Sequence, residues 1–169
     1  MHTSMHAVKP AYAYACLSIA GKENPPYACL SNAYTEHLRS ALAASSPVFE
    51  AAFTSMMQQD ESATYEIQDS TPEAVEAMLC FIYTGEQPGP DLLAPVFNLA
   101  MMYELDSLAK ITSPRFAGEV SLSNVKTFID VLQLWSNRSA VAAEAFEAML
   151  LVIREAPTSD MLKASFVAV

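Results

Sequence analysis

Residues 46–85 read SPVFEAAFTSMMQQDESATYEIQDSTPEAVEAMLCFIYTG, and this stretch decides the fold of the chain. Ser46 predicts a helix N-cap and Pro47 the first helical position, where the missing proline N–H breaks no bond. The apolar residues that follow recur at three- and four-residue spacing, which predicts an amphipathic helix. The polar residues 58–62 predict a loop after it.

The second half of this stretch predicts a short strand and another helix. Residues 64–67 have the composition of a strand. Thr71 is placed to cap a helix that begins at Pro72, and Gly85 ends that helix because glycine readily adopts the left-handed conformation. The helix is apolar on most sides near its end, so we expect it to be central in the fold.

The residues upstream extend this pattern. Residues 14–20 suit a strand that runs into a turn. Pro25 and Pro26 forbid a helix and mark a loop. Residues 36–44 have helical composition, with apolar positions four apart on one face.

Downstream, Asp91 is expected to cap a further helix. Pro95 falls in its first turn, where an amide has no intrahelical acceptor. Leu99, Met102 and Leu105 continue its apolar face. After a turn near 113–114, amphipathic patterns predict three more helical segments, at roughly 123–135, 139–154 and 158–166.

The composition of the 169 residues limits both the fold and the partners. Hydrophobic residues make up 52% and charged residues 17%, so the chain can bury a core, and its four glycines favour a helix-dominated fold. The net charge is −10. Nucleic acids and anionic membrane surfaces bind Lys and Arg, so we expect neither as a partner.

The three cysteines, Cys16, Cys29 and Cys80, form neither a disulfide framework nor a zinc spacing. This indicates a reducing compartment, so we expect the protein in the cytoplasm, the nucleus or both. No apolar run reaches the roughly 18 residues of a membrane span. The segment AYAYACLSIAG is better interpreted as a half-buried strand than as a signal peptide, because its flanking basic region is poor.

Few residues carry the chemistry of a catalytic or metal site. His37 has no cysteine or acid at catalytic spacing, so a structural role is favoured over activation of a nucleophile. The acidic cluster around the predicted strand consists of Asp60, Glu61, Glu66 and Asp69. It lacks the spacing of a calcium loop, and we interpret it as a solvated acidic edge. The sequence therefore predicts no catalytic residue, no metal site and no cofactor.

Met57 is a candidate for exposed binding surface. It stands beside the polar loop, and a methionine side chain packs well against irregular partners. The alternative for any such methionine is core filling. We expect core filling for Met56 and Met102, because both fall on apolar helix stripes.

Residues 46–110 resemble a BTB/POZ domain. The matching pieces are SPVFEAAF, EIQDSTPEAVEAMLCFIYTG and LAMMYELDSLAK, in that order and with family-like spacing. CLSIAGKE, residues 16–23, resembles the first strand and hairpin of the family. LSNVKTFIDVLQLW, from Leu122, resembles the start of the helical extension in speckle-type POZ proteins. The resemblance implies an α+β fold in which a helical cluster carries a short β-sheet and is followed by a few extra helices.

The resemblance also implies a division of the chain into three regions. We expect a loose N-terminal leader over residues 1–13. A BTB/POZ-like domain, divergent before residue 37, is expected over 14–112. A C-terminal helical extension, partly similar to a BACK domain, is expected over 113–169.

The family resemblance further implies a function. BTB/POZ domains are interaction domains without enzymatic activity that homodimerise, and speckle-type members bind a cullin-3 scaffold so that a target is ubiquitinated. In this chain Met57, Gln58 and Gln59 stand in the corresponding cullin-binding loop. Tyr103 and Asp106 are candidates for a supporting surface. The implied partners are a cullin-3-type scaffold and a second copy of the chain or a related BTB protein.

Departures from the family pattern favour an alternative. Gln59 stands where the family carries a glutamate, which removes the charge that strengthens hydrogen bonds. An insertion-like stretch, NPPYACLSNAYTE, precedes the helix of His37, and Ala13, Tyr14 and Ala15 stand where the family has dimer-interface elements. We also expect no room for a target-recognition domain. The alternative is an oligomerisation module or decoy that pairs with full-length relatives without binding cullin. An enzyme with a coincidental motif is disfavoured, because no convergent set of titratable residues is visible.

Overall fold

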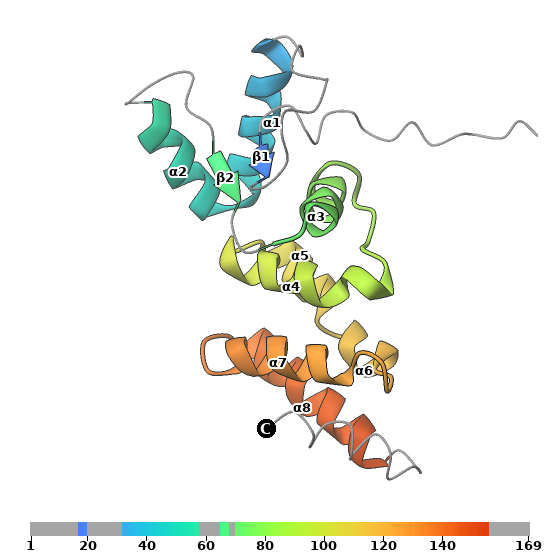
Figure 1. Cartoon of the computed structure of the whole chain (residues 1–169). Coiled ribbons are helices and arrows are strands. Elements are labelled where there is room, and N and C mark those ends of the chain that lie inside the picture. Colours follow the sequence, from blue (N-terminus) through green and yellow to red (C-terminus); the bar gives the residue numbers. More distant parts are fainter. Residues whose placement is uncertain (1–16, 20–31, 58–64, 68–69, 156–169) are drawn as a thin grey trace, which may run out of the picture.

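The computed structural model describes residues 17–19, 32–57, 65–67 and 70–155, which fold into a mostly helical stack (Figure 1). The predictions for the leader over 1–13 and for a helix at 158–166 lie outside the described residues. The elements in chain order are β1 (Leu17–Ile19), α1 (Asn32–Ser45), α2 (Pro47–Met57), β2 (Tyr65–Ile67), α3 (Pro72–Thr84), the 3-10 turn η2 (Pro90–Leu92), α4 (Leu93–Met102), α5 (Asp106–Thr112), α6 (Arg115–Glu119), α7 (Val125–Ser136) and α8 (Ala140–Glu155).

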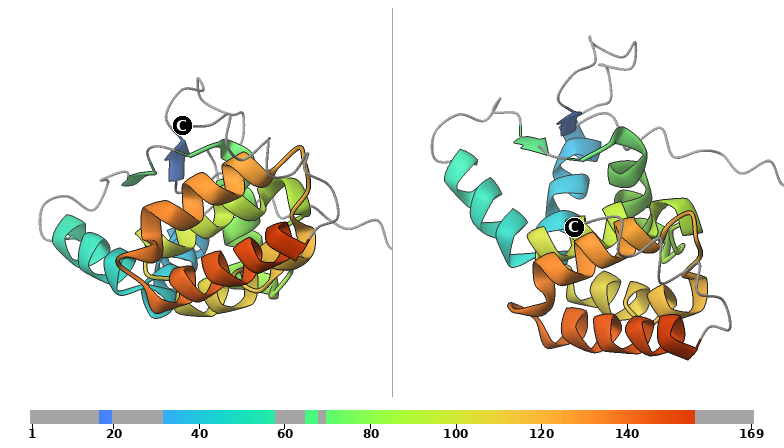
Figure 2. Two further views of the ribbon diagram at one scale, coloured as in Figure 1. Left: turned by 90° about the horizontal axis from the view of Figure 1, so that it is seen from below. Right: turned by 60° about the horizontal axis from the view of Figure 1, so that its bottom comes forward.

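The elements form three levels along the chain. β1, β2, α1 and α2 lie at one end, α3, α4 and α5 in the middle, and α6, α7 and α8 at the other end (Figure 1). Helix α4 contacts α3 on one side and α7 on another. Helices α7 and α8 pack side by side as an antiparallel pair (Figure 2). None of the helices in the described ranges has the length and apolar character that a bilayer crossing requires.

The two strands form a small parallel pair. Leu17 lies opposite Tyr65 and Ile19 opposite Ile67. Each strand has three residues, and Ile67 is buried, so its side chain attaches the pair to the core. In the described part of the chain this pair is the whole sheet, and the short β-sheet of the family fold stays a prediction.

Three helix ends follow directly from the local sequence. The N–H of Phe49 donates to Ser46 Oγ at 3.1 Å, and the N–H of Ala74 donates to Thr71 Oγ1 at 3.3 Å. Gly85 has a φ of 74°, and its N–H donates at 2.8 Å to the carbonyl four residues back. The predicted N-caps of α2 and α3 and the predicted C-cap of α3 are confirmed.

The prediction that Asp91 caps α4 is wrong. Asp91 lies inside η2. The N-cap of α4 is Leu92, whose apolar side chain cannot accept a capping hydrogen bond. Pro90 presets a helical φ at the first residue of η2, so the chain has already turned before Asp91. Pro95 is the third residue of α4, where its missing N–H breaks no intrahelical bond.

The apolar faces predicted for the middle and C-terminal helices are largely confirmed. Leu99 and Leu105 are buried, and Met102 is half-buried and packs against the core. The side chain of Met56 lies outside the described residues. The segments predicted at 123–135 and 139–154 are helices α7 and α8, each with one buried stripe.

Phe116 connects the middle level of the fold to the C-terminal helices. Its side chain is fully buried. Its ring meets Phe97 of α4 edge-on at a centroid distance of 5.1 Å and Phe128 of α7 edge-on at 4.7 Å. Edge-to-face contacts at such distances add to the energy of burial. One hydrophobic core therefore extends from the first helices into α7 and α8.

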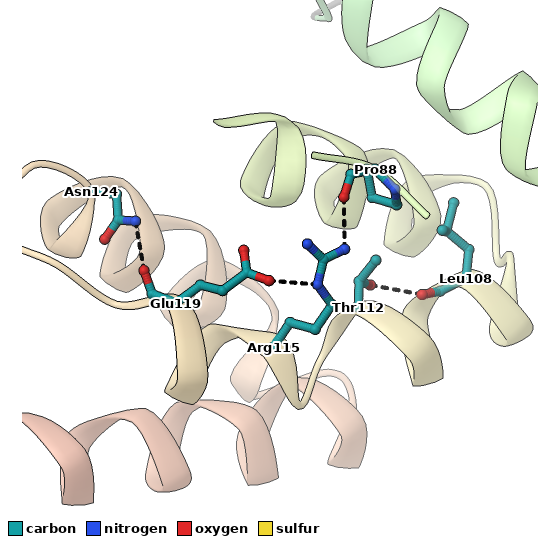
Figure 3. A network of polar contacts seen from close by, with 6 residues as sticks. All are labelled: Pro88, Leu108, Thr112, Arg115, Glu119 and Asn124. Atoms are coloured by element: carbon teal, nitrogen blue, oxygen red, sulfur yellow. Dashed lines mark hydrogen bonds and ion pairs between the residues drawn. The ribbon is translucent and has the colours of Figure 1, made fainter. Parts of the chain in front are cut away.

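A polar network around Arg115 fixes the same junction (Figure 3). Arg115 Nη1 donates to the carbonyl of Pro88 at 2.7 Å, and its Nε donates to Glu119 Oε1 at 2.7 Å. The carbonyl of Glu119 accepts from Asn124 Nδ2 at 2.9 Å. The network joins the loop after α3 to α6 and to the start of α7.

Replacing Arg115 with alanine is expected to reduce the free energy of unfolding by about 2 kcal/mol. Pro88 is buried, and the Glu119 carboxylate is mostly buried. The substitution leaves the Pro88 carbonyl and this carboxylate without the guanidinium donor. Urea denaturation measures the change. Arg115→Lys should lose less, because it keeps the charge but not the fixed two-pronged geometry.

The matched control for Arg115→Ala is Lys110→Ala. Lys110 Nζ lies 3.9 Å from Asp106 Oδ2, and these side chains are 66% and 85% exposed. Exposed pairs contribute between zero and about 1 kcal/mol. Equal losses in the two alanine variants would contradict a role for the Arg115 network.

Candidate partner-binding surface

Helix α2 carries the first of the predicted partner-binding residues. Met57 is its last residue. The side chain of Met57, and all of Gln58 and Gln59, lie outside the described residues. The C-terminal end of α2 lies at the edge of the molecule, away from α3 and α4, in the views of both Figure 1 and Figure 2. This end of the helix therefore lies at the periphery of the described fold.

The first turn of α2 is attached to the C-terminal end of α4. Ser46 Oγ donates a hydrogen bond to the carbonyl of Tyr103. The ring of Phe49 stacks on that of Tyr103 at a centroid distance of 4.5 Å and an interplanar angle of 4°. Phe53 continues the stack, 5.8 Å from Phe49. We call Ser46, Phe49, Phe53 and Tyr103 the α2 joint, because they hold one end of α2 while its other end faces outward.

The prediction that Tyr103 supplies supporting surface is wrong for its ring. Tyr103 is only 6% exposed, since the ring stacks on Phe49 in the α2 joint. The backbone explains this position. Helix α4 ends at Met102, and Glu104 adopts a left-handed φ of 51° that turns the chain toward α5. Tyr103 is left at the inner side of that turn.

Asp106 lies on the surface, as the prediction of a supporting surface requires. It is the first residue of α5, and its carboxylate meets only the exposed Lys110 among the ion pairs of the described residues. An exposed carboxylate at this position can accept hydrogen bonds from a partner with little desolvation. A role for Asp106 in binding stays a prediction.

The structure does not describe the side chains considered for metal or catalytic chemistry. The side chains of His37 and Glu66, and all of Asp60, Glu61 and Asp69, lie outside the described residues. Within the described ranges, no group of three or more His, Cys, Asp or Glu is arranged to hold a metal ion. The described geometry is that of a packed helical scaffold.

Ser46 caps α2 as predicted, and it has a second role that the sequence did not indicate. The Ser46 hydroxyl also reaches Tyr103, 57 residues further along the chain. No local pattern signals such a contact. The available signal was indirect: Ser46 is a polar residue placed between two helices whose apolar stripes both require burial.

A comparison with protein-family models supports the resemblance seen in the sequence. A BTB/POZ domain model matches residues 29–116, which is just over half of the chain. The matched region contains the α2 joint, the outward end of α2 and Asp106. It ends at Phe116, the residue that connects to the C-terminal helices. BTB domains are generally interaction modules that self-associate or pair with other BTB proteins. The presence of this domain suggests that the protein is an adaptor for protein–protein interaction. The chain belongs to the BTB/POZ family.

Proposed function

We propose that this protein is a non-catalytic adaptor that links to a cullin-3 ubiquitin ligase scaffold. The proposed contact is the end of α2 and the loop that follows it, through Met57, Gln58 and Gln59, with Asp106 at the rim. The observation that carries the proposal is the α2 joint. It attaches the base of α2 through Ser46 and Phe49, and the opposite end of α2 lies at the edge of the described fold (Figure 1).

A helix end and loop suit recognition through a few buried anchors. Such interfaces concentrate their binding energy in a small number of residues, surrounded by contacts that exclude water. Met57 is the proposed apolar anchor, because its flexible side chain adapts to a partner groove. Gln58 and Gln59 supply hydrogen-bond donors and acceptors, and Gln59 lacks the charge of the family's glutamate.

The binding proposal predicts opposite effects for two substitutions in this surface. Met57→Ala should weaken binding to the cullin-3 N-terminal domain by about tenfold or more, since it removes the proposed anchor. Gln59→Glu should strengthen it by about five- to tenfold, because a charge-assisted hydrogen bond replaces a neutral one. Isothermal titration calorimetry with purified proteins measures both changes.

Leu122→Ala is the matched control for this titration. Leu122 is 55% exposed and precedes α7, at the other end of the molecule from α2. Its binding should equal that of the unchanged protein. The cullin proposal fails if neither the unchanged protein nor Gln59→Glu binds at concentrations on the order of tens of micromolar.

A second candidate function is a BTB oligomerisation module or decoy that pairs with full-length relatives. The observation that favours it is Gln59 itself, which lacks the charge expected for cullin binding. Co-purification with a full-length BTB relative, but not with cullin, supports this function over the first. The two candidate functions use the same BTB fold and differ in the protein that it binds.

The domain boundaries predicted from the sequence remain part of this proposal. A BTB-like domain over 14–112 would be followed by an extension over 113–169 with partial BACK character. The packing of α7 against α4 supports an extension that is attached to the BTB domain and shares its core.

A further inference from the structure

The C-terminal half of α4 and the residue that follows it are contacted by two distant parts of the chain. On one side, Trp135 Nε1 of α7 donates to Asn98 Oδ1 at 2.8 Å. Just after the end of α4, the carbonyl of Tyr103 accepts from Ser46, which caps α2. Asn98 and Tyr103 are separated by little more than one helical turn. The C-terminal helices and the base of α2 therefore meet on one short segment.

Asn98 connects these two contacts locally. Its Nδ2 lies 3.5 Å from the sulfur of Met102, the residue immediately before Tyr103. The N–H of Tyr103 in turn donates to the carbonyl of Leu99 at 2.9 Å. The side chain that binds Trp135 thus also packs along the turn that presents the Tyr103 carbonyl to Ser46.

Trp135 is itself held in place. It is half-buried and packs against the core, and the Arg138 guanidinium lies over its ring at 5.8 Å from the centroid. The indole has a single N–H, and Asn98 supplies its acceptor. The hydrogen bond therefore fixes the orientation of the indole ring. Such a bond limits rotation of α4 relative to α7.

Helix α2 depends on this segment for its position. Within the described residues it packs mainly on α1, and its first turn reaches α4 through the α2 joint. A loosened last turn of α4 shifts the Tyr103 carbonyl and ring, which are the groups that Ser46 and Phe49 contact.

We infer that Trp135 and Asn98 are positioning residues for α2, so that docking of the C-terminal helices stiffens the candidate partner-binding surface. The inference rests on the proposed function only in taking the end of α2 as that surface. It assigns the C-terminal helices a regulatory part: conditions or partners that release α7 from α4 loosen α2.

Hydrogen–deuterium exchange on the free full-length protein tests this coupling. Trp135→Phe keeps a ring and removes the N–H, and Asn98→Ala removes the acceptor. Each should speed amide exchange at residues 51–57 of α2 by about fivefold, the factor expected for loss of one net hydrogen bond. The double variant should show no larger change than Asn98→Ala alone, because Trp135→Phe removes only a bond that Asn98→Ala already removes.

Three controls separate coupling from general loss of stability. Leu134→Ala, at an exposed neighbour of Trp135 on α7, should leave exchange in α2 unchanged. Ser46→Ala should speed exchange in α2 but not in α7, because it breaks the α2 joint directly. Ile153→Val, in the buried stripe of α8, lowers global stability without touching Asn98.

Two results would overturn the inference. The first is unchanged exchange at residues 51–57 in both Trp135→Phe and Asn98→Ala. The second is an equal acceleration in Ile153→Val at matched global stability. The measurement contains no cullin, so a protein that fails to bind cullin can still show the coupling, and a protein that binds cullin can lack it.

Discussion

Phe116→Ala is expected to reduce the free energy of unfolding by about 3–5 kcal/mol, which is a large part of the stability of an ordinary domain. Phe116 is fully buried between Phe97 and Phe128. Its removal leaves a cavity where α4, α6 and α7 meet and breaks two edge-to-face contacts. Differential scanning calorimetry should show Tm lower by about 10 °C for a chain of this size.

A milder variant keeps this prediction testable if Phe116→Ala does not fold. Phe116→Leu preserves most of the apolar volume and should lose about 1–2 kcal/mol. Leu122→Ala, at a residue 55% exposed, is the control and should change stability by no more than about 0.5 kcal/mol. A separate, later transition for α7 and α8 in the Phe116 variants would contradict one shared core.

Phe49→Ala is expected to reduce the free energy of unfolding by a similar amount, about 3–5 kcal/mol. The loss arises at the α2 joint, at the other end of the fold from Phe116. Phe49 is fully buried and stacks on both Tyr103 and Phe53. Without its ring the α2 joint keeps only the Ser46 hydrogen bond of the contacts described above. Chemical denaturation measures the loss, and exchange of α2 amides should increase more than that of α8 amides.

Glu50→Gln is the neighbouring control for Phe49→Ala. Glu50 is exposed in the first turn of α2, where its charge favours the helix dipole by about 0.3–1 kcal/mol. Its loss should therefore be small. If Phe49→Ala were no more destabilising than Glu50→Gln, the stacking at the α2 joint would not hold the helix.

Local signals in the sequence predicted much of the fold. Ser46, Thr71 and Gly85 act within one helical turn of their own positions, so residue type alone indicates the helix end. The stripes of α7 and α8 are similarly local, because helical periodicity places their apolar residues on one face. The Asp91 prediction failed where a 3-10 turn, begun by Pro90, preceded the helix.

Contacts between distant segments could not be predicted in this way. Arg115 binds the carbonyl of Pro88, 27 residues earlier, and Trp135 binds Asn98, 37 residues earlier. Tyr103 was a candidate for supporting surface, but the turn at Glu104 leaves its ring in the core. Each of these contacts depends on how whole helices pack against one another. The sequence of a single segment carries no information about that packing.

The central claim is that this chain is a BTB interaction module, and sedimentation equilibrium of the purified protein with and without the cullin-3 N-terminal domain tests it most directly. The account predicts an assembly heavier than one 18.4 kDa chain, formed by self-association, by a complex with the cullin domain, or by both. A species of 18.4 kDa alone in the first sample, and only the two unbound proteins in the second, at concentrations on the order of tens of micromolar, would contradict it.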